Sequence, residues 1–502
     1  MEAPSGTVRD WLDRHAQARG DETSHGFVDQ DMRFTWSGLR HHACAGASML
    51  SAAGMKPGDT VALMCPNGPE AVLAFFAVTY AGGIATMINL VAGADAVAYA
   101  LDHSRAKLAF IHDDAMDLFK AANVKGMTRL NPGDLLTPDH EFATHLPELR
   151  ADDPALLMYT SGTTGKPKGV LHTHASLLAG GWTTAVAHAL QPQDRALCVL
   201  PLYHINGLCV TLMAPLVSGG SVFVAPRFSA SKFWQWCADH GLTWFSVVPT
   251  IISHLLHGAE EPSNGGRQNL RFGRSASSAL APEVQTAFET RFGVPIIETM
   301  GLTETAAQIL SNPLPPMTRK VGSPGQAIGN DVAILNPDQS QAPINVQGEI
   351  AVRGPNVMAK YLHNPEATKE TFNRDGWLLT GDLGHIDQDG FVFVTGRKKE
   401  LIIKGGENIA PREIDEALYS HKAVIEAAAF ARPCTTYGER VEAAVTLEVG
   451  ADVSAQDLIA LCVQRLGKFK SPDCIHILDD LPKGPSGKIQ RLKLKDLTRN
   501  SP

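Results

Sequence analysis

The sequence has no apolar run long enough to cross a membrane. Its most apolar stretch, residues 71–78 (AVLAFFAV), is far shorter than a membrane helix needs to be. The opening residues MEAPSGTVRDWLDRH contain no apolar signal core, and the eight cysteines form neither a CxxC pair nor a Cys/His cluster with zinc spacing. We therefore expect no transmembrane segment, buried thiols in a reducing compartment and a cytoplasmic location.

An excess of positive charge is also missing. The chain has 44 Lys and Arg against 52 Asp and Glu, a net charge of −8, which removes a general electrostatic case for binding nucleic acid. Hydrophobic residues make up 44% and charged residues 19% of the 502 residues, as in a globular enzyme of about three domain-sized units. The sequence contains no repeat of solenoid period and no low-complexity tract.

Apolar runs typical of strands alternate with helix-like segments through most of the chain, which predicts an α/β fold. Residues 60–64, for example, have the pattern of a strand and precede a helix-like segment at residues 69–80. The pattern changes near residue 396, where a charged, glycine-rich stretch leads into a helix that begins at Pro411. We expect a large N-terminal domain of α/β subdomains (residues 1–397) and a smaller α+β domain (residues 398–502).

Residues 160–169, TSGTTGKPKG, follow a strand-like run and favour phosphate binding. The glycines can take positive φ and present backbone N–H groups as a concave nest, to which the hydroxyls and lysines add donors and charge. A P-loop needs four residues between its glycines, whereas only two separate Gly162 from Gly165. A solvated surface loop is the alternative. The predicted phosphate-binding residues are Thr160, Ser161, Gly162, Thr163, Thr164, Gly165 and Lys168.

Six motifs together resemble one family, the adenylate-forming enzymes, which include acyl-CoA synthetases, peptide-synthetase adenylation domains and luciferases. They follow one another in that family's order: TSGTTGKPKG, PLYHINGL, ETMGLTE, GWLLTGDLG, GRKKELIIKGGENIAP and LPKGPSGKIQR. The resemblance covers nearly the whole chain. It implies a small C-terminal domain that is mobile and rotates between two half-reactions. A carboxylate first attacks the α-phosphorus of ATP to give acyl-adenylate and pyrophosphate, and a thiol then displaces AMP.

The resemblance also implies catalytic roles for individual residues. Lys488 corresponds to the family's adenylation lysine, Thr303 to a residue that contacts the α-phosphate, and Glu304 to the Mg²⁺ ligand. Asp382 and Arg397 correspond to residues that bind the ribose hydroxyls. Without the motif order, a solvated lysine, a helix N-terminal Thr-Glu pair and a surface turn would be the ordinary interpretations of these positions.

Further positions follow from the same resemblance. Lys399 matches the hinge about which the C-terminal domain turns, and Gly405 and Gly406 match the glycines that admit the thiol arm of CoA. The remaining ATP or AMP contacts are Ser277, Thr299, Met300 and Gly301, and the predicted acyl pocket comprises His204, Asn206, Ser275, Ser278 and Ala307.

Two departures from the family pattern concern substrates. Met300 replaces the aromatic residue that commonly stacks on adenine, and a thioether can still pack against a ring. The stretches FSASKFWQW, TWFSVVPT, RSASSALAP and SNPLPP look closest to the oxalyl-CoA synthetase branch, yet Ala307 stands where that branch has a histidine. The hydroxyl-rich run at residues 275–278 suggests a polar pocket floor and therefore a small, polar carboxylic acid.

The leading hypothesis is an AMP-forming carboxylic acid:CoA ligase that uses ATP, Mg²⁺ and coenzyme A. The alternatives are a stand-alone enzyme that loads a carrier protein, a ligase for aryl or fatty acids, luciferase-like oxygenation and a non-catalytic relic. The oligomeric state is left open, with a homodimer as one alternative. Pro482 and the Gly487-Lys488 pair fit the pattern seen where bacterial acyl-CoA synthetases are acetylated, which would make a lysine acetyltransferase a partner.

Overall fold

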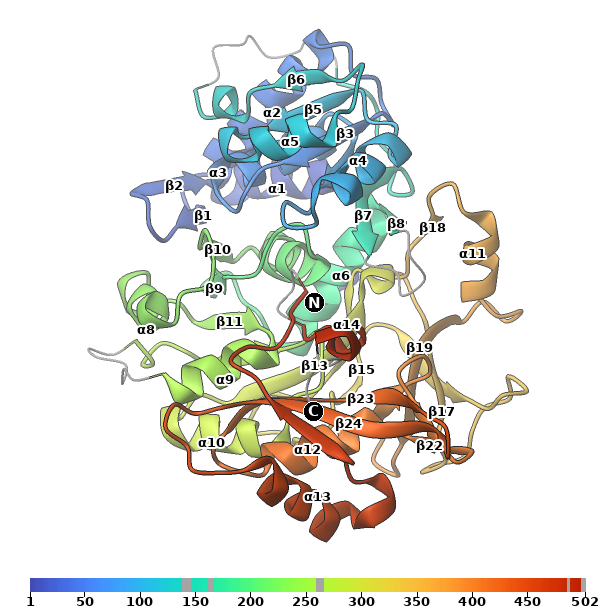
Figure 1. The fold of residues 1–502 in the computed structure, drawn as a ribbon. Helices are drawn as coiled ribbons and strands as arrows, with labels where there is room; N and C mark the ends of the chain where they lie inside the picture. The colour runs from blue at the N-terminus through green and yellow to red at the C-terminus, as the bar shows by residue number, and fades with distance from the viewer. Residues whose placement is uncertain (138–145, 161–166, 259–265, 485–487, 498–502) are drawn as a thin grey trace.

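The computed structural model describes residues 1–137, 146–160, 167–258, 266–484 and 488–497. These residues form four sheets, and the predicted alternation of strands and helices is confirmed (Figure 1). Residues 60–64 form strand β3 (Thr60–Met64) and residues 69–80 form helix α3 (Pro69–Tyr80). Every residue of α3 except Glu70 is buried, as an all-apolar helix requires. In the described part of the chain, none of the helices has the length and hydropathy of a membrane span.

Seven strands form the first sheet, in the spatial order β18-β8-β7-β4-β3-β5-β6. All neighbours between β7 and β6 are parallel, whereas β7 and β8 form an antiparallel hairpin. The other bounds in this region are β4 (Ile84–Met87), α4 (Ala94–His103), β5 (Leu108–Ile111), η1 (Asp113–Ala115), α5 (Met116–Ala122), β6 (Thr128–Leu130), η2 (Pro132–Leu135), β7 (Pro154–Thr160), β8 (Lys168–Thr173) and β18 (Lys360–Tyr361).

Nine strands form the second sheet, in the order β15-β14-β13-β12-β11-β9-β10-β1-β2. The bounds of its strands are β1 (Thr23–Phe27), β2 (Met32–Thr35), β9 (Arg195–Cys198), β10 (Ser221–Val224), β11 (Trp244–Val247), β12 (Phe272–Ser275), β13 (Ile296–Leu302), β14 (Ala307–Ser311) and β15 (Gln326–Ala327). The helices in this part of the chain are α1 (Val8–Arg19), α2 (Trp36–Ala52), α6 (His174–Ala187), the π-helix η3 (Asn206–Met213), α7 (Ala214–Ser218), α8 (Ala230–Asp239), α9 (Pro249–His257), α10 (Pro282–Phe292) and the short 3₁₀ helix η4 (Thr303–Thr305).

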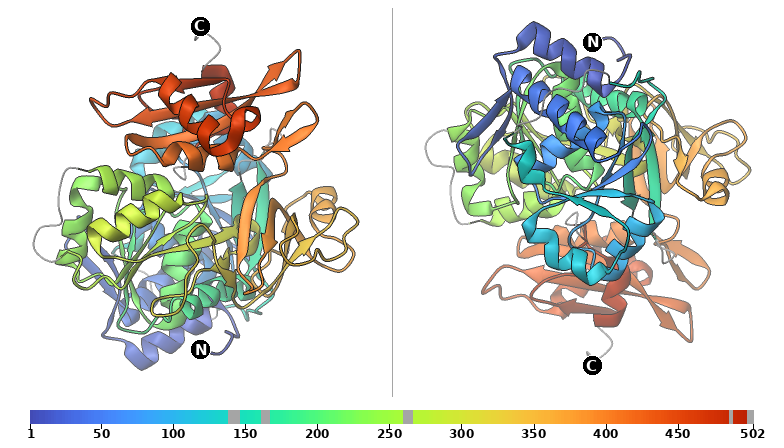
Figure 2. Two further views of the ribbon diagram at one scale, coloured as in Figure 1. Left: turned by 90° about the horizontal axis from the view of Figure 1, so that it is seen from below. Right: turned by 90° about the horizontal axis from the view of Figure 1, so that it is seen from above.

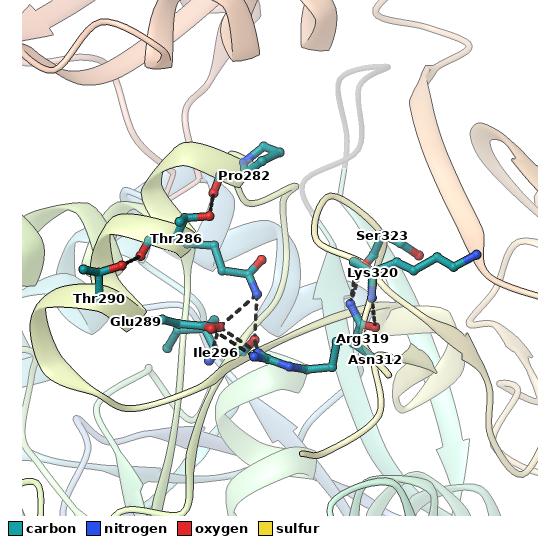
Figure 3. A network of polar contacts seen from close by, with 10 residues as sticks. Pro282, Thr286, Glu289, Thr290, Ile296, Asn312, Arg319, Lys320 and Ser323 are labelled. Carbon is teal, nitrogen blue, oxygen red and sulfur yellow. Dashed lines mark hydrogen bonds and ion pairs between the residues drawn. The ribbon is translucent and has the colours of Figure 1, made fainter. Parts of the chain in front are cut away.

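A polar network fixes the segment that follows β14 against α10 (Figure 3). Arg319 donates two hydrogen bonds to the carboxylate of Glu289, with N–O distances of 2.7 and 2.9 Å. Burial raises the pKa of Glu289, but its hydrogen bonds, with that from Arg319 the largest, bring it below the ordinary value. Asn312 completes the network by donating to the carbonyls of Lys320 and Ser323. This segment is therefore held to the sheet rather than left as a free loop.

A small antiparallel sheet, β16-β17-β19-β20, carries the chain toward its C-terminal part. The bounds here are β16 (Asp331–Leu335), β17 (Gly348–Arg353), α11 (Pro365–Thr371), β19 (Leu378–Ile386) and β20 (Val392–Arg397).

The last sheet and its helices form a separate layer against the rest of the molecule (Figure 2). Its elements are β21 (Ile402–Lys404), β22 (Glu407–Ile409), α12 (Pro411–Tyr419), β23 (Val424–Cys434), β24 (Gly438–Leu447), α13 (Ala455–Lys470), β25 (Cys474–Ile477) and α14 (Arg491–Leu497). This layer has its own apolar core, in which Ile414 and Leu418 of α12 pack with Val441 and Val445 of β24. The predicted large N-terminal and small C-terminal parts are thus both present.

Candidate active site

The small sheet and the C-terminal layer bring Asp382, Arg397 and Lys488 together. Asp382 and Arg397 face one another across β19 and β20, and Arg397 Nε lies 3.0 Å from Asp382 Oδ1. Burial raises the pKa of Asp382, and the positive charges of Arg397 and Lys488 oppose that change. Lys488 therefore lies within electrostatic reach of a carboxylate that is 106 positions earlier in the chain (488 − 382).

Neighbouring groups shape the charge of Lys488. Burial lowers the pKa of Lys488, while the negative charge of Glu400 opposes the change. The backbone around Lys488 is anchored on both sides, because its carbonyl accepts a hydrogen bond from Gly484 N–H at 2.7 Å and Arg491 forms an ion pair with Asp415. The backbone that carries the lysine is therefore held by contacts on both sides.

Glu304 is the middle residue of η4, which directly follows β13. Tyr361 donates its hydroxyl to Glu304 Oε1 at 2.7 Å, and the Nζ of Lys168 stands 4.6 Å from the centre of the Tyr361 ring. Burial, together with the negative charge of Glu304, raises the pKa of Tyr361, so the phenol stays protonated and acts as the donor. Glu304 also influences the titration of Asp382, which joins this group to the Lys488 cluster.

The carbonyl of Thr303 is held by a buried histidine. Burial lowers the pKa of His172 to about 4, so the ring is neutral at physiological pH, and its Nε2–H donates to Thr303 O at 2.7 Å. This contact fixes η4 to β8, the strand that carries Lys168. The phosphate-loop end and the Thr-Glu motif are therefore positioned by the same strand.

Only the two ends of the predicted phosphate loop can be described. Thr160 pairs with Lys168 at the end of the β7–β8 hairpin. The five other predicted residues, Ser161, Gly162, Thr163, Thr164 and Gly165, lie outside the described residues.

The predicted nucleotide-contacting strand has an unusual backbone. A Cβ on Gly301 would lie 1.4 Å from the carbonyl oxygen of Ala307, so only glycine fits there. Ala306, Ala307 and Ser277 adopt positive φ values of 44°, 81° and 76°, a conformation that costs energy in residues with a side chain. Such strain is concentrated at functional sites, and here it surrounds the Thr-Glu motif. Thr299 and the half-buried Met300 lie on the same strand, β13.

The predicted acyl-pocket residues come from two neighbouring segments. Asn206 begins η3 and donates to Ser277 Oγ at 3.4 Å, while Ser275 ends β12 and is fully buried. Half-buried Ser278 follows on the same segment, and His204 lies two residues before the start of η3. Ala307, also predicted to line the pocket, opens β14. Sequence reasoning missed Arg274, which hydrogen-bonds to Asn206 and whose only signal was a cation in the short run FGRS.

The predicted hinge directly follows the strand that ends at Arg397, and the predicted CoA glycines lie in the next hairpin. Lys399 is exposed in the turn between β20 and β21. Gly405 and Gly406 form the β21–β22 turn with φ values of +60° and +87°. A Cβ on Gly406 would meet open space, so glycine is needed there for its backbone conformation rather than for room.

The C-terminal layer is held in place by contacts with α9. Ser253 Oγ donates to the carbonyl of Ile425 at 2.6 Å, and His257 Nδ1 lies 2.7 Å from Glu448 Oε1. Arg412 adds a hydrogen bond of 3.0 Å to the carbonyl of Gly322. These contacts hold the layer that carries Lys488 against the N-terminal part of the chain.

The donor set suits a nucleotide with a divalent cation. Among the described residues, His, Cys, Asp and Glu nowhere gather in threes at metal-binding distance, so Glu304 would be joined by phosphate and water oxygens around Mg²⁺. Asp382 offers two carboxylate oxygens at the spacing of a diol, as a ribose requires.

Comparisons with known proteins agree with this geometry. Residues 12–362 match the AMP-binding enzyme family, and residues 413–488 match the AMP-binding enzyme C-terminal domain. The chain is 46% identical over 475 residues to a sulfoacetate–CoA ligase of Cupriavidus necator, with 93% of each chain covered. It is 38% identical over 464 residues to an oxalate–CoA ligase of Arabidopsis thaliana, covering 89% of this chain and 90% of the relative.

Solved structures match the fold over nearly the whole chain. ATP-bound MatB from Rhodopseudomonas palustris superposes with a TM-score of 0.89 at 29% identity, covering 99% of both chains. The predictions of an adenylate-forming α/β fold, of an AMP-forming acid–CoA ligase and of ATP, Mg²⁺ and CoA as its substrates and cofactor are thereby confirmed. The chain belongs to the family of AMP-binding enzymes.

Proposed function

We propose that this ligase activates a short, polar carboxylic acid, with Lys488 as the catalytic lysine of adenylation. The electrostatic interaction of Lys488 with Asp382 and Arg397 carries the proposal, because these residues are the predicted catalytic lysine and the predicted ribose ligands, and Arg397 pairs with Asp382 at 3.0 Å. The names of the two relatives, which act on sulfoacetate and oxalate, support a short polar acid as substrate.

The residues divide the adenylation step between them. Asp382 and Arg397 hold the ribose, which fixes the α-phosphorus relative to the bound acid. Lys488 places a positive charge where negative charge develops as the carboxylate attacks and pyrophosphate leaves, so it stabilises the transition state more than the ground state. Thr303 and Lys168 hold phosphate oxygens, and Mg²⁺ at Glu304 would neutralise their charge.

The second half-reaction requires Lys488 to move away from the adenylate site. The turn containing Lys399 joins the two parts of the chain, so a domain boundary between residues 397 and 398 allows the C-terminal layer to rotate as a unit. Rotation about Lys399 would withdraw Lys488 and bring the Gly405-Gly406 turn to the acyl-adenylate. There the thiol of CoA would displace AMP.

Lysine acetylation would regulate the same residue. An acetyl group on Lys488 removes the charge that adenylation needs. Full adenylation activity of a protein acetylated at Lys488 would contradict this. A homodimer and a cytoplasmic location stay predictions.

The decisive test is pyrophosphate release across a panel of acids, each with and without CoA. The panel runs from oxalate and sulfoacetate through aryl acids to long-chain fatty acids. We expect a maximum among the short polar acids and CoA-dependent release of AMP. A maximum among aryl or fatty acids would overturn the substrate class, and turnover that does not respond to CoA would indicate a carrier protein as acceptor.

A further inference from the structure

Arg274 is a buried cation at the centre of the second sheet. It lies on β12, its side chain is among the largest in the fully buried core, and only 1% of its surface is exposed. Its register partner on β11 is Ser246, so the two side chains share one face of the sheet. Asn206 from η3 and Gln308 from β14 complete its surroundings.

All the hydrogen bonds of Arg274 go to neutral oxygens. Nη1 donates to Asn206 Oδ1 at 2.7 Å and to Ser246 Oγ at 3.0 Å, and Nε donates to Gln308 Oε1 at 3.3 Å. Within the described ranges, Arg274 forms no ion pair, and its Nη2 makes no hydrogen bond. The guanidinium is therefore solvated by amides and a hydroxyl but not neutralised.

Neighbouring ionisable groups do not supply the missing negative charge. Burial raises the pKa of Cys209 to about 12 and lowers that of His188 to about 3, so both face Arg274 in neutral form. Glu298, a buried carboxylate on the next strand, instead accepts from Leu280 N–H and interacts with Arg412. Burial lowers the pKa of Arg274 itself to about 9, which leaves it cationic at neutral pH.

A buried charge without a counter-ion is costly, and enclosed cations are ordinarily paired. Asn206 links this charge to the predicted acid site, because it accepts from Arg274 and donates to Ser277. Ser275, the next residue after Arg274, is fully buried, and in the described part of the structure its Oγ has no hydrogen-bond partner. The unneutralised cation therefore lies one hydrogen-bonded residue away from Ser277 of the segment expected to hold the acid, whereas Ser275, the next residue of the strand, points to the opposite face of the sheet.

We propose that Arg274 binds a second anionic group of the substrate, so that the acid is a short dianion with a carboxylate at one end and a carboxylate or sulfonate at the other. This inference rests on the proposed function and assigns the non-reacting end of the acid to Arg274, with Asn206 as its positioning residue. The planar fork of a guanidinium matches the oxygens of a carboxylate or sulfonate, and Nη2 is the nitrogen left to bind them. Removing one charge from the acid leaves the cation buried and unpaired, which selects against monoanions.

The test compares matched acids in acid-dependent ATP–pyrophosphate exchange, which reports adenylation without CoA. Sulfoacetate and malonate serve as dianions and propanoate as the monoanion. Wild-type enzyme should favour the dianions. Arg274→Met should lower kcat/KM for the dianions by about 100-fold or more and for propanoate by no more than about fivefold, because only the dianions lose a desolvated charge pair.

Two further variants make the result specific. Arg271→Met removes a nearby arginine that is already paired with Asp194 at 2.6 Å, and it should leave the ratio of dianion to monoanion activity unchanged. Arg274→Lys keeps the charge but loses the fork, so it should retain a dianion preference with an intermediate rate. Arg274→Lys also tests the role of Arg274 if Arg274→Met does not fold. If Arg274 were purely structural, the ratio of dianion to monoanion activity in Arg274→Lys would equal that of wild type.

The outcomes separate this inference from the proposed function. Adenylation that favours propanoate, or an equal loss for all acids in folded Arg274 variants, would overturn the role of Arg274 while leaving the ligase intact. If none of the tested acids supports ATP–pyrophosphate exchange, the result would count against the proposed substrate class. In that case binding still decides the role of Arg274: sulfoacetate should raise the Tm of wild type more than that of Arg274→Lys, and equal shifts would overturn it.

Discussion

The cluster around Arg274 and the cluster around Lys488 are both built on buried charge, but they are held in different ways. Arg274 is surrounded by residues of β11, β14 and η3, all parts of the same sheet and its covering helix. Lys488 comes within electrostatic reach of Asp382 from a separate layer, which packs against the N-terminal part through contacts such as Ser253 with Ile425. The difference suggests that choice of acid is fixed in the rigid part, whereas catalysis depends on a residue that can be withdrawn.

Lys488→Ala should have the largest effect that separates the two clusters. Adenylation should fall by roughly two or more orders of magnitude, because a charge contact specific to the transition state is lost. Thioester formation from synthetic acyl-adenylate and CoA should be nearly unchanged, since Lys488 is withdrawn in that step. Measuring both half-reactions separately checks this, and an equal loss in both would contradict domain rotation.

Asp382→Asn should have the next largest effect. The amide leaves Arg397 without its ion-pair partner and presents one acceptor oxygen instead of two to the ribose. We expect KM for ATP to rise about 10- to 100-fold, equivalent to about 1.4–2.7 kcal/mol. The ratio of dianion to monoanion activity should stay at the wild-type value, and a changed ratio would mean that the two clusters are not independent.

The sequence predicted a single helix more readily than it predicted either of these two clusters. The helix-like apolar segment at residues 69–80 was predicted where the structure has α3, because that helix is set by its local sequence. Lys488 and Asp382 could be paired only through resemblance to a family, since no local pattern joins positions so far apart. Arg274 was not identified even by that resemblance, because a cation in the run RFGRS is ordinarily expected to be exposed. Its burial depends on hydrogen bonds to Asn206, Ser246 and Gln308, which lie on three other elements.

The pH dependence of adenylation should report on the environment of Lys488. Burial lowers the pKa of this lysine, so the protonated form that adenylation needs is lost as pH rises, at a lower pH than for an exposed lysine. A rate profile of ATP–pyrophosphate exchange from neutral to strongly alkaline pH should show this decline. In Lys488→Arg, whose charge persists, the remaining activity should decline only at higher pH; an unchanged profile would assign the decline to another group.

Loosening the C-terminal layer should have a smaller effect. His257→Ala combined with Ser253→Ala removes two hydrogen bonds that hold the C-terminal layer, which carries Lys488, against α9. At about 0.5–1 kcal/mol each, these losses should slow adenylation several-fold without slowing thioester formation. Arg40→Ala, which removes the exposed pair with Asp13 far from the junction, is the control and should alter neither half-reaction.

The network between α10 and the segment after β14 should affect stability rather than chemistry. Glu289→Gln keeps the shape of the side chain but replaces the charged hydrogen bonds from Arg319, which we expect to cost about 1–2 kcal/mol of unfolding free energy at neutral pH. Because the pKa of Glu289 is lowered in the folded protein, its contribution is present above the unfolded pKa and is lost as pH falls through the folded one. Urea unfolding of wild type and variant should therefore differ at neutral pH and converge in acid. If the variant also lost selectivity between dianions and monoanions, the rigidity of the acid-binding cluster would depend on this outer anchor, and the contrast between the two clusters would be one of degree.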